Sequence, residues 1–196
     1  MRIIAGSLRR RTLEAPAGLA TRPTSDRLRE TLFNVLAPRI EGAHFLDLYA
    51  GSGAVGIEAL SRGAKAATFI ERAPAALKVL RGNLARLGVT ASFHVHPGNV
   101  GAYLRKARPG DAGFDVVFLD PPYDEENEYG ATLDLLGGAA SGLLAEHAVV
   151  IAEHRRKEKL RETCGRLART RLLEQGDAAL SFYAADVQTG SSSGVG

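Results

Sequence analysis

His44-Phe-Leu-Asp-Leu-Tyr-Ala-Gly-Ser-Gly-Ala-Val-Gly-Ile-Glu58 is the stretch from which the architecture of this chain can be predicted. The mainly apolar run at positions 45–49 predicts a short buried strand, and residues 54–62 predict a helix that ends at the next glycine. Gly51 and Gly53 predict a tight turn between them, because glycine adopts positive φ and permits close approach. A strand, a glycine turn and a helix N-terminus form a place where a ligand can lie against bare backbone.

The spacing of the glycines alone allows more than one ligand. Gly51, Gly53 and Gly56 fit Gly-x-Gly-x-x-Gly, a pattern that suggests a dinucleotide. Asp47 precedes the first glycine by four residues, and a carboxylate beside the turn suits a cation or an amine rather than a pyrophosphate. Asp-x-x-x-Gly-x-Gly resembles the first motif of the methyltransferases that use S-adenosylmethionine (AdoMet), a sulfonium that also carries an ammonium group. A glycine turn that only packs a helix is the alternative.

Strands and helices are predicted to alternate along the rest of the chain, which indicates the α/β class with a mostly parallel sheet covered on both faces. The predicted strands are the apolar runs at 67–71, 92–95, 114–119 and 148–152. The predicted helices lie at 74–87, 99–107 and 129–136. Residues 166–174 and 178–185 predict an antiparallel hairpin at the sheet edge.

The N-terminal region is predicted to form a small extension that packs on this sheet. Residues 2–5 and 10–13 predict a β-hairpin, which is too small to fold alone. Thr24 or Ser25 is expected to cap the following helix, and Pro38 is expected to help end it.

The composition fits one soluble domain in a reducing cytoplasm. A chain of 196 residues can bury one core, no apolar run approaches the ~20 residues that cross a bilayer, and no signal peptide is visible. The single Cys164 cannot form an internal disulfide. We divide the chain into a basic extension at 1–40, a main domain at 41–188 and a Gly/Ser-rich tail at 189–196 that we expect to be disordered, and we expect a monomer.

The positive charge of the chain is concentrated near its start. Residues 1–39 hold eight arginines and three acidic residues, a net charge of +5, whereas the remainder carries −2. Such a segment indicates a polyanionic partner, and a merely solvated basic surface is the alternative. The candidate nucleic-acid contacts are Arg2, Arg9, Arg10, Arg11 and Arg22. Thr24 and Arg27 are separate candidates for lining the ligand pocket.

Polar residues fall at four predicted strand ends, where ligands bind in sheets of this kind: Asp47, Glu71, Asn99 and Asp120. Glu71 follows Gly51 by twenty residues, the spacing at which a carboxylate takes ribose hydroxyls, and Asn99 is expected near the adenine. The candidate cofactor contacts are Asp47, Tyr49, Ala50, Gly51, Ser52, Gly53, Glu71, Arg72, Asn99 and Val100.

Asp120-Pro121-Pro122-Tyr123 resembles the (Asp/Asn)-Pro-Pro-(Tyr/Phe) motif of methyltransferases that modify planar nitrogens. An exocyclic amine is a poor nucleophile because its lone pair is delocalised into the ring. The Asp120 carboxylate and the Pro121 carbonyl are candidates to accept its two N–H groups and hold the nitrogen pyramidal. Tyr123 offers an aromatic face for stacking the base, worth about 1–3 kcal/mol. We therefore expect Asp120, Pro121 and Tyr123 to be catalytic.

Six stretches make the chain similar to the bacterial small-subunit ribosomal RNA guanine-N2 methyltransferases (RsmD-type). They are 2–6, 21–24, 26–30, 46–53, 56–64 and the Asp-Pro-Pro-Tyr motif at 120–123. The resemblance implies a Rossmann-like class I methyltransferase fold with a seven-stranded sheet and an N-terminal hairpin and helix. It also implies AdoMet as cofactor, and as partner a guanine of 16S rRNA within an assembling small subunit. One departure is Asn99, since the family usually has Gly-Asp where this chain has Gly98-Asn99.

Other functions fit parts of this pattern. Asp-Pro-Pro-Tyr also suits DNA adenine or protein glutamine, but no sizeable DNA-recognition region is visible. A non-catalytic RNA-binding protein would not need an amine-polarising loop, and a dehydrogenase would leave Asp47 unexplained. Methylation at base carbon 5 needs a nucleophilic cysteine near the active loop, and Cys164 is remote from any such motif. No metal is expected, because the five histidines form no ligand pattern.

Overall fold

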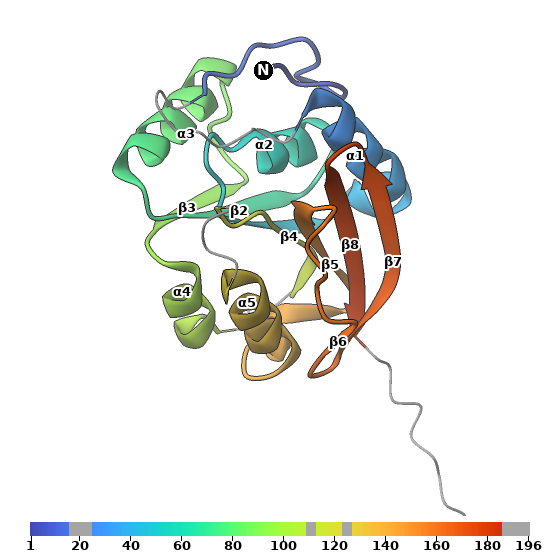
Figure 1. Cartoon of the computed structure of the whole chain (residues 1–196). Helices are drawn as coiled ribbons and strands as arrows, with labels where there is room; N and C mark the ends of the chain where they lie inside the picture. Colours follow the sequence, from blue (N-terminus) through green and yellow to red (C-terminus); the bar gives the residue numbers. More distant parts are fainter. Residues whose placement is uncertain (16–24, 109–112, 123–126, 186–196) are drawn as a thin grey trace, which may run out of the picture.

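The computed structural model describes residues 1–15, 25–108, 113–122 and 127–185, and these form one domain around an eight-stranded sheet (Figure 1). The strands lie in the order β3-β2-β1-β4-β5-β8-β7-β6. Those that pair in parallel are His44–Leu48 (β1), Ala66–Glu71 (β2), Phe93–Pro97 (β3), Phe114–Leu119 (β4) and Leu144–Arg155 (β5). The antiparallel part consists of Thr163–Cys164 (β6), Leu167–Gln175 (β7) and Ala178–Ala185 (β8).

The predicted mostly parallel sheet with a C-terminal hairpin is confirmed, and the strand count was wrong by one. β6 is an additional strand of two residues that pairs with β7, and Gly165 lies in the left-handed turn between them with φ 58°. Two residues are too few to produce a periodic pattern in the sequence. β8 lies within the sheet between β5 and β7, so the hairpin extends the sheet from β5.

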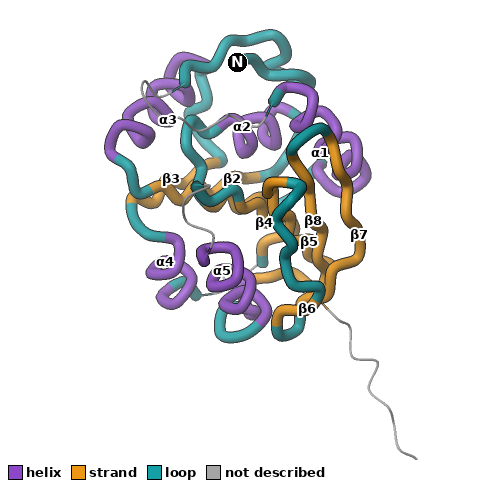
Figure 2. Tube along the Cα trace, in the orientation of Figure 1, coloured by secondary structure: helices purple, strands orange, loops and turns teal. Residues whose placement is uncertain are grey.

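The helices cover both faces of the sheet, as Figures 1 and 2 show. One face carries Asp26–Ile40 (α1), Ala54–Ser61 (α2) and Pro74–Leu87 (α3), and the other carries Val100–Lys106 (α4), Asn127–Gly137 (α5) and the short helix Ser141–Leu143 (η1). Successive residues of β1 serve opposite faces: Phe45 packs with α1–α3, and Leu46 packs with α4 and α5. A sheet covered on both sides needs apolar residues at consecutive positions, which explains the apolar strands of the sequence.

The first helix begins as predicted but does not end as predicted. Ser25 is its N-cap, and the Ser25 hydroxyl accepts a hydrogen bond from the Leu28 N–H at 3.1 Å. Pro38 lies inside α1, which continues to Ile40. Ile40 is buried in the core, and its packing outweighs the one backbone bond that proline removes near the helix end.

The N-terminal segment, residues 1–15, is an antiparallel loop that lies over the helices of one face. The predicted antiparallel pairing is confirmed by the Arg2–Thr12 bridge, but the paired residues are too few to be strands. The Ile3 N–H donates to the Arg11 carbonyl at 3.0 Å, and the Leu13 N–H donates to the Met1 carbonyl at 3.0 Å. The predicted tail at 189–196 lies outside the described residues.

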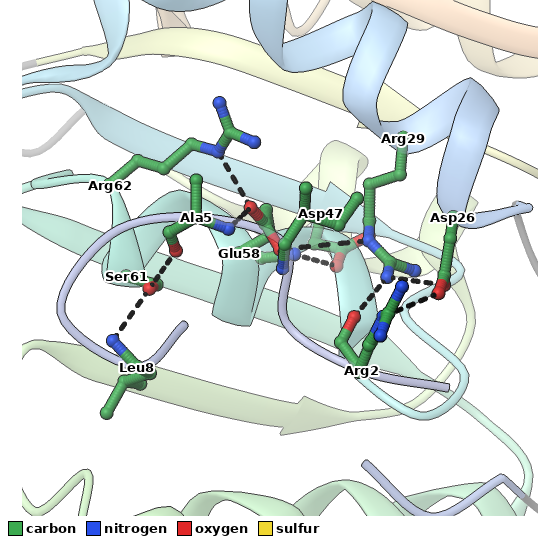
Figure 3. Close-up of polar contacts among 11 residues, drawn as sticks. Arg2, Ala5, Leu8, Asp26, Arg29, Asp47, Glu58, Ser61 and Arg62 are labelled. Carbon is green, nitrogen blue, oxygen red and sulfur yellow. Dashed lines mark hydrogen bonds and ion pairs between the residues drawn. The ribbon is translucent and has the colours of Figure 1, made fainter. Parts of the chain in front are cut away.

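Glu58 of α2 is the main anchor of this segment. Its carboxylate accepts the N–H of Ile4 at 2.8 Å and the N–H of Ala5 at 3.0 Å. The same carboxylate accepts the Arg62 Nε–H at 2.7 Å (Figure 3). Because the Glu58 side chain is fully buried, these bonds replace the water that the carboxylate loses on folding.

Arg29 of α1 completes this buried network, which Figure 3 shows beneath the N-terminal segment. Its Nη2 donates to the Arg2 carbonyl at 2.5 Å and to Asp26 Oδ1 at 2.9 Å. Its Nε lies 3.9 Å from Glu58 Oε2, and both side chains are fully buried. The two opposite charges compensate each other in a place where either alone would be costly.

Glu58→Gln should therefore destabilise the protein by about 3–5 kcal/mol, the usual cost of removing one partner of a buried ion pair. The substitution keeps the size of the side chain and removes the charge that faces Arg29 and Arg62. Urea denaturation measures the free energy of unfolding. Glu146→Gln, at an exposed position of β5, is the matched control and should change it by less than about 0.5 kcal/mol. Equal effects of the two substitutions would contradict the role of Glu58.

Candidate functional site

The predicted strand-end residues gather at one edge of the sheet. The chain passes from β1 to β2 and β3 on one side and returns to β4 on the other, so the strand order reverses between β1 and β4. In open parallel sheets, ligands bind at such a switch point, outside the carboxyl ends of the strands. The glycine turn follows β1, and Asp120 directly follows β4.

The glycine turn has the left-handed backbone that the sequence predicted. Gly51 has φ 55° and Gly53 has φ 79°, and the Gly53 N–H donates to the Ala50 carbonyl at 2.7 Å. A Cβ at Gly53 would lie 2.2 Å from Leu80 Cδ1 of α3, so a side chain there would also require Leu80 to shift. A Cβ at Gly51 would meet nothing closer than 4.0 Å, so its requirement for glycine comes from the backbone angle.

Asp47 lies beneath the turn and holds the start of α2. Its Oδ2 accepts the Gly56 N–H at 2.9 Å, and the side chain is buried. Burial raises the pKa of Asp47 to about 7; the Gly56 hydrogen bond opposes this rise, and the negative charge of Glu71 adds to it. The carboxyl therefore has a structural role in addition to the predicted role toward a cationic ligand.

Glu71 holds the opposite side of the turn. Its Oε2 accepts the Gly51 N–H at 2.8 Å, and its Oε1 accepts the Ala73 N–H at 2.7 Å. Each oxygen retains a second lone pair, so the carboxylate can also accept bonds from hydroxyl groups of a ligand. Arg72, the next residue, is exposed.

Asn99 has a defined structural function that the sequence reasoning did not include. Its Oδ1 accepts the Ala102 N–H at 3.1 Å, which makes Asn99 the N-cap of α4. Val100 is buried in the core on that face of the sheet. The proposed contact of Asn99 with adenine stays a prediction, and it would have to coexist with this cap.

Asp120 follows β4 and is partly enclosed, with Pro121 buried beside it in the chain. Desolvation raises the pKa of Asp120 well above its usual range, and the negative charges of Glu153 and Asp47 add to this rise. Tyr123 lies outside the described residues, so its predicted stacking role stays a prediction.

Glu153 belongs to the site and was missed from the sequence. It is buried near the end of β5, and the pairing of Leu119 with Ala152 makes Glu153 the counterpart of Asp120 on the neighbouring strand. An acidic residue directly after the apolar run 148–152 was the available signal. With Asp47, Glu71 and Asp120 it makes this edge of the sheet acidic, and the charges of Glu153 and Asp47 add to the raised pKa of Asp120.

Tyr49, between β1 and the glycine turn, reaches across to α5. Its hydroxyl donates to Glu128 Oε2 at 2.7 Å and lies 2.7 Å from the Thr132 hydroxyl. Its φ of 64° is left-handed, which is uncommon for a residue with a side chain. Ser52 of the same turn also has a distant partner, since its carbonyl accepts from Asn83 Nδ2 at 2.9 Å.

The predicted nucleic-acid contacts are only partly brought together. A hollow of about 390 Å³ is lined by Arg2, Ile3, Ile4, Arg9, Arg10, Asp26, Arg27 and Glu30. Arg27 thus lies with the basic group from which the sequence reasoning had separated it. Arg11 points elsewhere, and its Nη2 donates to the Arg86 carbonyl at 3.4 Å. Arg22 and Thr24 lie outside the described residues.

The described part of the chain offers neither a metal cluster nor a membrane-spanning helix. No group of three or more histidine, cysteine, aspartate or glutamate residues there is arranged to hold a metal ion. None of the helices in those residues has both the length and the apolar character that a membrane span requires.

Comparisons with known proteins find relatives over nearly the whole chain. The profile of the family described as "Conserved hypothetical protein 95" matches residues 1–184. The chain is 39% identical over 183 residues to YlbH of Bacillus subtilis, and the aligned residues cover 93% of this chain and 98% of the relative. It is 42% identical over 153 residues to "Ribosomal RNA small subunit methyltransferase D" of Escherichia coli, and the aligned residues cover 78% of this chain and 74% of the relative.

Solved structures share the whole fold. The protein yhhF of Escherichia coli has a TM-score of 0.82 and 37% identity, with 96% of this chain and 99% of that chain covered. A hypothetical protein of Thermus thermophilus has a TM-score of 0.76 and 32% identity, with 93% and 98% covered. The N-terminal extension and the sheet are therefore both shared with these relatives.

The buried Asp47 should make stability depend on pH. Because its pKa rises from 3.8 to about 7 on folding, the folded protein binds more protons in that range, and stability falls as pH rises through it. Asp47→Asn retains an oxygen for the Gly56 N–H and removes this source of pH dependence. The pKa change of Asp47 corresponds to at most about 4 kcal/mol of unfolding free energy. Urea denaturation at pH 5 and pH 8 should show a smaller loss of stability in Asp47→Asn than in the parent. Asp134→Asn, at an exposed position of α5, is the control and should lose as much stability between pH 5 and pH 8 as the parent does. If Asp47→Asn lost the same amount of stability, Asp47 would not be the source of the pH dependence.

Proposed function

This chain belongs to the family described as Conserved hypothetical protein 95, the RsmD-type methyltransferases, and on this premise we propose that it methylates the exocyclic N2 amine of a guanine in 16S rRNA with AdoMet as donor. The observation that carries the proposal is the position of Asp120 and Pro121. They follow β4 at the switch point, on the strand next to β1 and its glycine turn. A cofactor bound at the turn and an amine held by Asp120 would thus meet at one edge of the sheet.

The residues around the turn fit AdoMet. Bound AdoMet supplies an electrophilic methyl group on a sulfonium, and the buried acidic residues favour that positive charge. Glu71 is assigned to the ribose hydroxyls, because its carboxylate oxygens can accept further bonds. The left-handed turn at Gly51–Gly53 offers backbone without a side chain in the way. The assigned contacts are Asp47, Tyr49, Ala50, Gly51, Ser52, Gly53, Glu71, Arg72, Asn99 and Val100.

Asp120 and Pro121 are assigned to the acceptor amine. Two acceptors aimed at the N–H groups keep the nitrogen lone pair directed toward the methyl group instead of into the ring. The amine must also lose a proton after methyl transfer. The raised pKa of Asp120 makes its carboxylate a better acceptor for that proton. Tyr123 is assigned to stacking on the guanine.

The N-terminal segment is assigned to RNA. The arginines of the hollow suit phosphate groups around a guanine that has been turned out of its helix. The network of Glu58 and Arg29 fixes this segment to the same domain that carries the site. We further propose that the enzyme acts as a cytoplasmic monomer on RNA within an assembling small subunit.

Asp120→Ala should reduce kcat by at least about 100-fold while leaving the Kd for AdoMet within about threefold of the parent, because Asp120 meets the amine and not the cofactor. The assay is transfer of labelled methyl from AdoMet to undermethylated 16S rRNA, free and in 30S particles, followed by nucleoside analysis. Calorimetry gives the Kd. Asp134→Ala is the control, since Asp134 is an exposed residue that pairs with Arg161.

The same assay tests the substrate. N2-methylguanosine as product supports the proposal. Label in adenine or in protein, or none in either RNA preparation, would overturn the assignment of substrate. An Asp120→Ala enzyme that keeps most of its kcat would overturn the role of that residue alone.

Replacing both Arg9 and Arg10 by alanine should weaken RNA binding and flatten its salt dependence. Each lost phosphate contact on single-stranded RNA should lower the log–log slope by about 0.7. The Kd for AdoMet should not change. The matched control replaces Arg105 and Lys106, two exposed cations at the end of α4. A slope that is unaltered in the first variant would mean a solvated basic surface, with 155–157 as the next segment to test.

A further inference from the structure

We propose that Tyr49 is a positioning residue that joins the glycine turn to the helix after the Asp120-Pro121 motif, so that a ligand bound at the turn also orders the acceptor side of the site. The inference rests on the proposed methyl transfer and deepens it. Tyr49 belongs to the cofactor side by its place in the chain, directly after β1. Its hydroxyl, however, bonds the acceptor side, at Glu128 and Thr132 of α5.

The hydroxyl of Tyr49 bonds two side chains of α5. Tyrosine has one O–H, which the Glu128 carboxylate accepts at 2.7 Å. The Thr132 hydroxyl, at 2.7 Å, then donates to the tyrosine oxygen. Glu128 and Thr132 are four residues apart on α5 and therefore lie on one face of the helix. Thr132 is buried, so losing this partner would leave its hydroxyl with a desolvation cost.

The start of α5 is held from both strands that flank β4. Tyr49 follows β1, and the Tyr129 hydroxyl of α5 donates to the Glu153 carbonyl of β5 at 2.9 Å. β1 and β5 are the two neighbours of β4 in the sheet. Asp120 and Pro121 leave β4 between these two attachments, and the chain from there leads to α5. Two bonds from opposite sides thus hold the first turn of α5.

The backbone conformation of Tyr49 also supports its positioning role. Its φ of 64° costs about 1–3 kcal/mol for a residue with a Cβ, and such conformations cluster at functional sites. This angle turns the chain from β1 into the glycine turn while the Tyr49 side chain packs with the core on the α4 and α5 face. A shift of the turn would therefore move the hydroxyl and, with it, the first turns of α5.

Tyr49→Phe is the test, because phenylalanine keeps the ring and removes only the hydroxyl. The expected result is a fall in kcat of about tenfold or more, from the lost hydrogen bonds, with the Kd for AdoMet within about twofold of the parent. A second readout does not depend on methyl transfer: amide hydrogen exchange of residues 127–137 with and without S-adenosylhomocysteine. The parent should show protection of these amides on binding, and Tyr49→Phe should lose most of that protection.

Tyr183→Phe is the matched control. This substitution likewise removes only a tyrosine hydroxyl. The Tyr183 side chain is fully buried on the antiparallel part of the sheet, and its hydroxyl donates to the Arg161 carbonyl at 2.8 Å. It should keep both kcat and the ligand-induced protection. Thr132→Val, which removes the same contact from the α5 side, should combine with Tyr49→Phe less than additively.

The proposal is overturned if Tyr49→Phe retains the kcat and protection of the parent, or if Tyr183→Phe loses as much of both. Failure of the proposed function has a different signature. A parent protein that binds S-adenosylhomocysteine but methylates no RNA would refute the substrate, and the hydrogen exchange would still decide the role of Tyr49.

Discussion

Two buried carboxylates hold the glycine turn after β1, and the candidate site is built around that turn. Asp47 accepts the N–H of Gly56, and Glu71 accepts the N–H of Gly51. The first N–H groups of a helix have no partner within the helix, and a tight turn leaves some of its N–H groups unpaired, so Gly56 and Gly51 need acceptors from elsewhere. Because the two carboxylates come from β1 and β2, the turn keeps its shape only while these neighbouring strands stay in register.

The same arrangement gives the site its chemical character. Asp47, Asp120 and Glu153 lie in or directly after three adjacent strands, and the negative charges of Glu153 and Asp47 raise the pKa of Asp120. Burying several acids together is unfavourable without a counter-charge, and a sulfonium ligand would supply one. The carboxylates of Asp47 and Glu153 are unfavourable beside Asp120 in the protein alone. The same carboxylates would favour a bound sulfonium, and they make Asp120 a stronger proton acceptor.

The N-terminal segment depends on a comparable use of buried polar groups. It contributes few apolar residues to the core, among them Ile3 and Leu13. Four buried side chains of the helices bind its backbone: Arg29, Glu58, Ser61 and Asn83. Glu58 and Arg29 hold its first residues, and Asn83 accepts the Glu14 N–H at 2.9 Å. Since Asn83 also donates to the glycine turn at Ser52, one side chain links the basic segment to the cofactor side of the site.

Local patterns in the sequence were sufficient for the strand, turn and helix at 44–61, for the positions of Glu71 and Asp120, and for a helix cap at Thr24 or Ser25, of which the structure uses Ser25. Each depends on neighbours within a few residues, where periodicity, glycine and capping chemistry act directly. Only the tertiary structure revealed β6 and the persistence of α1 beyond Pro38.

Three features of the site also came from the tertiary structure alone: Glu153 beside Asp120, the Tyr49 contact with α5, and the grouping of Arg27 with Arg2. In each case the partner lies tens of residues away, as with the 79 positions that separate Tyr49 from Glu128. Sheet register and helix packing bring such residues together, and a local pattern carries no information about which distant residue will arrive.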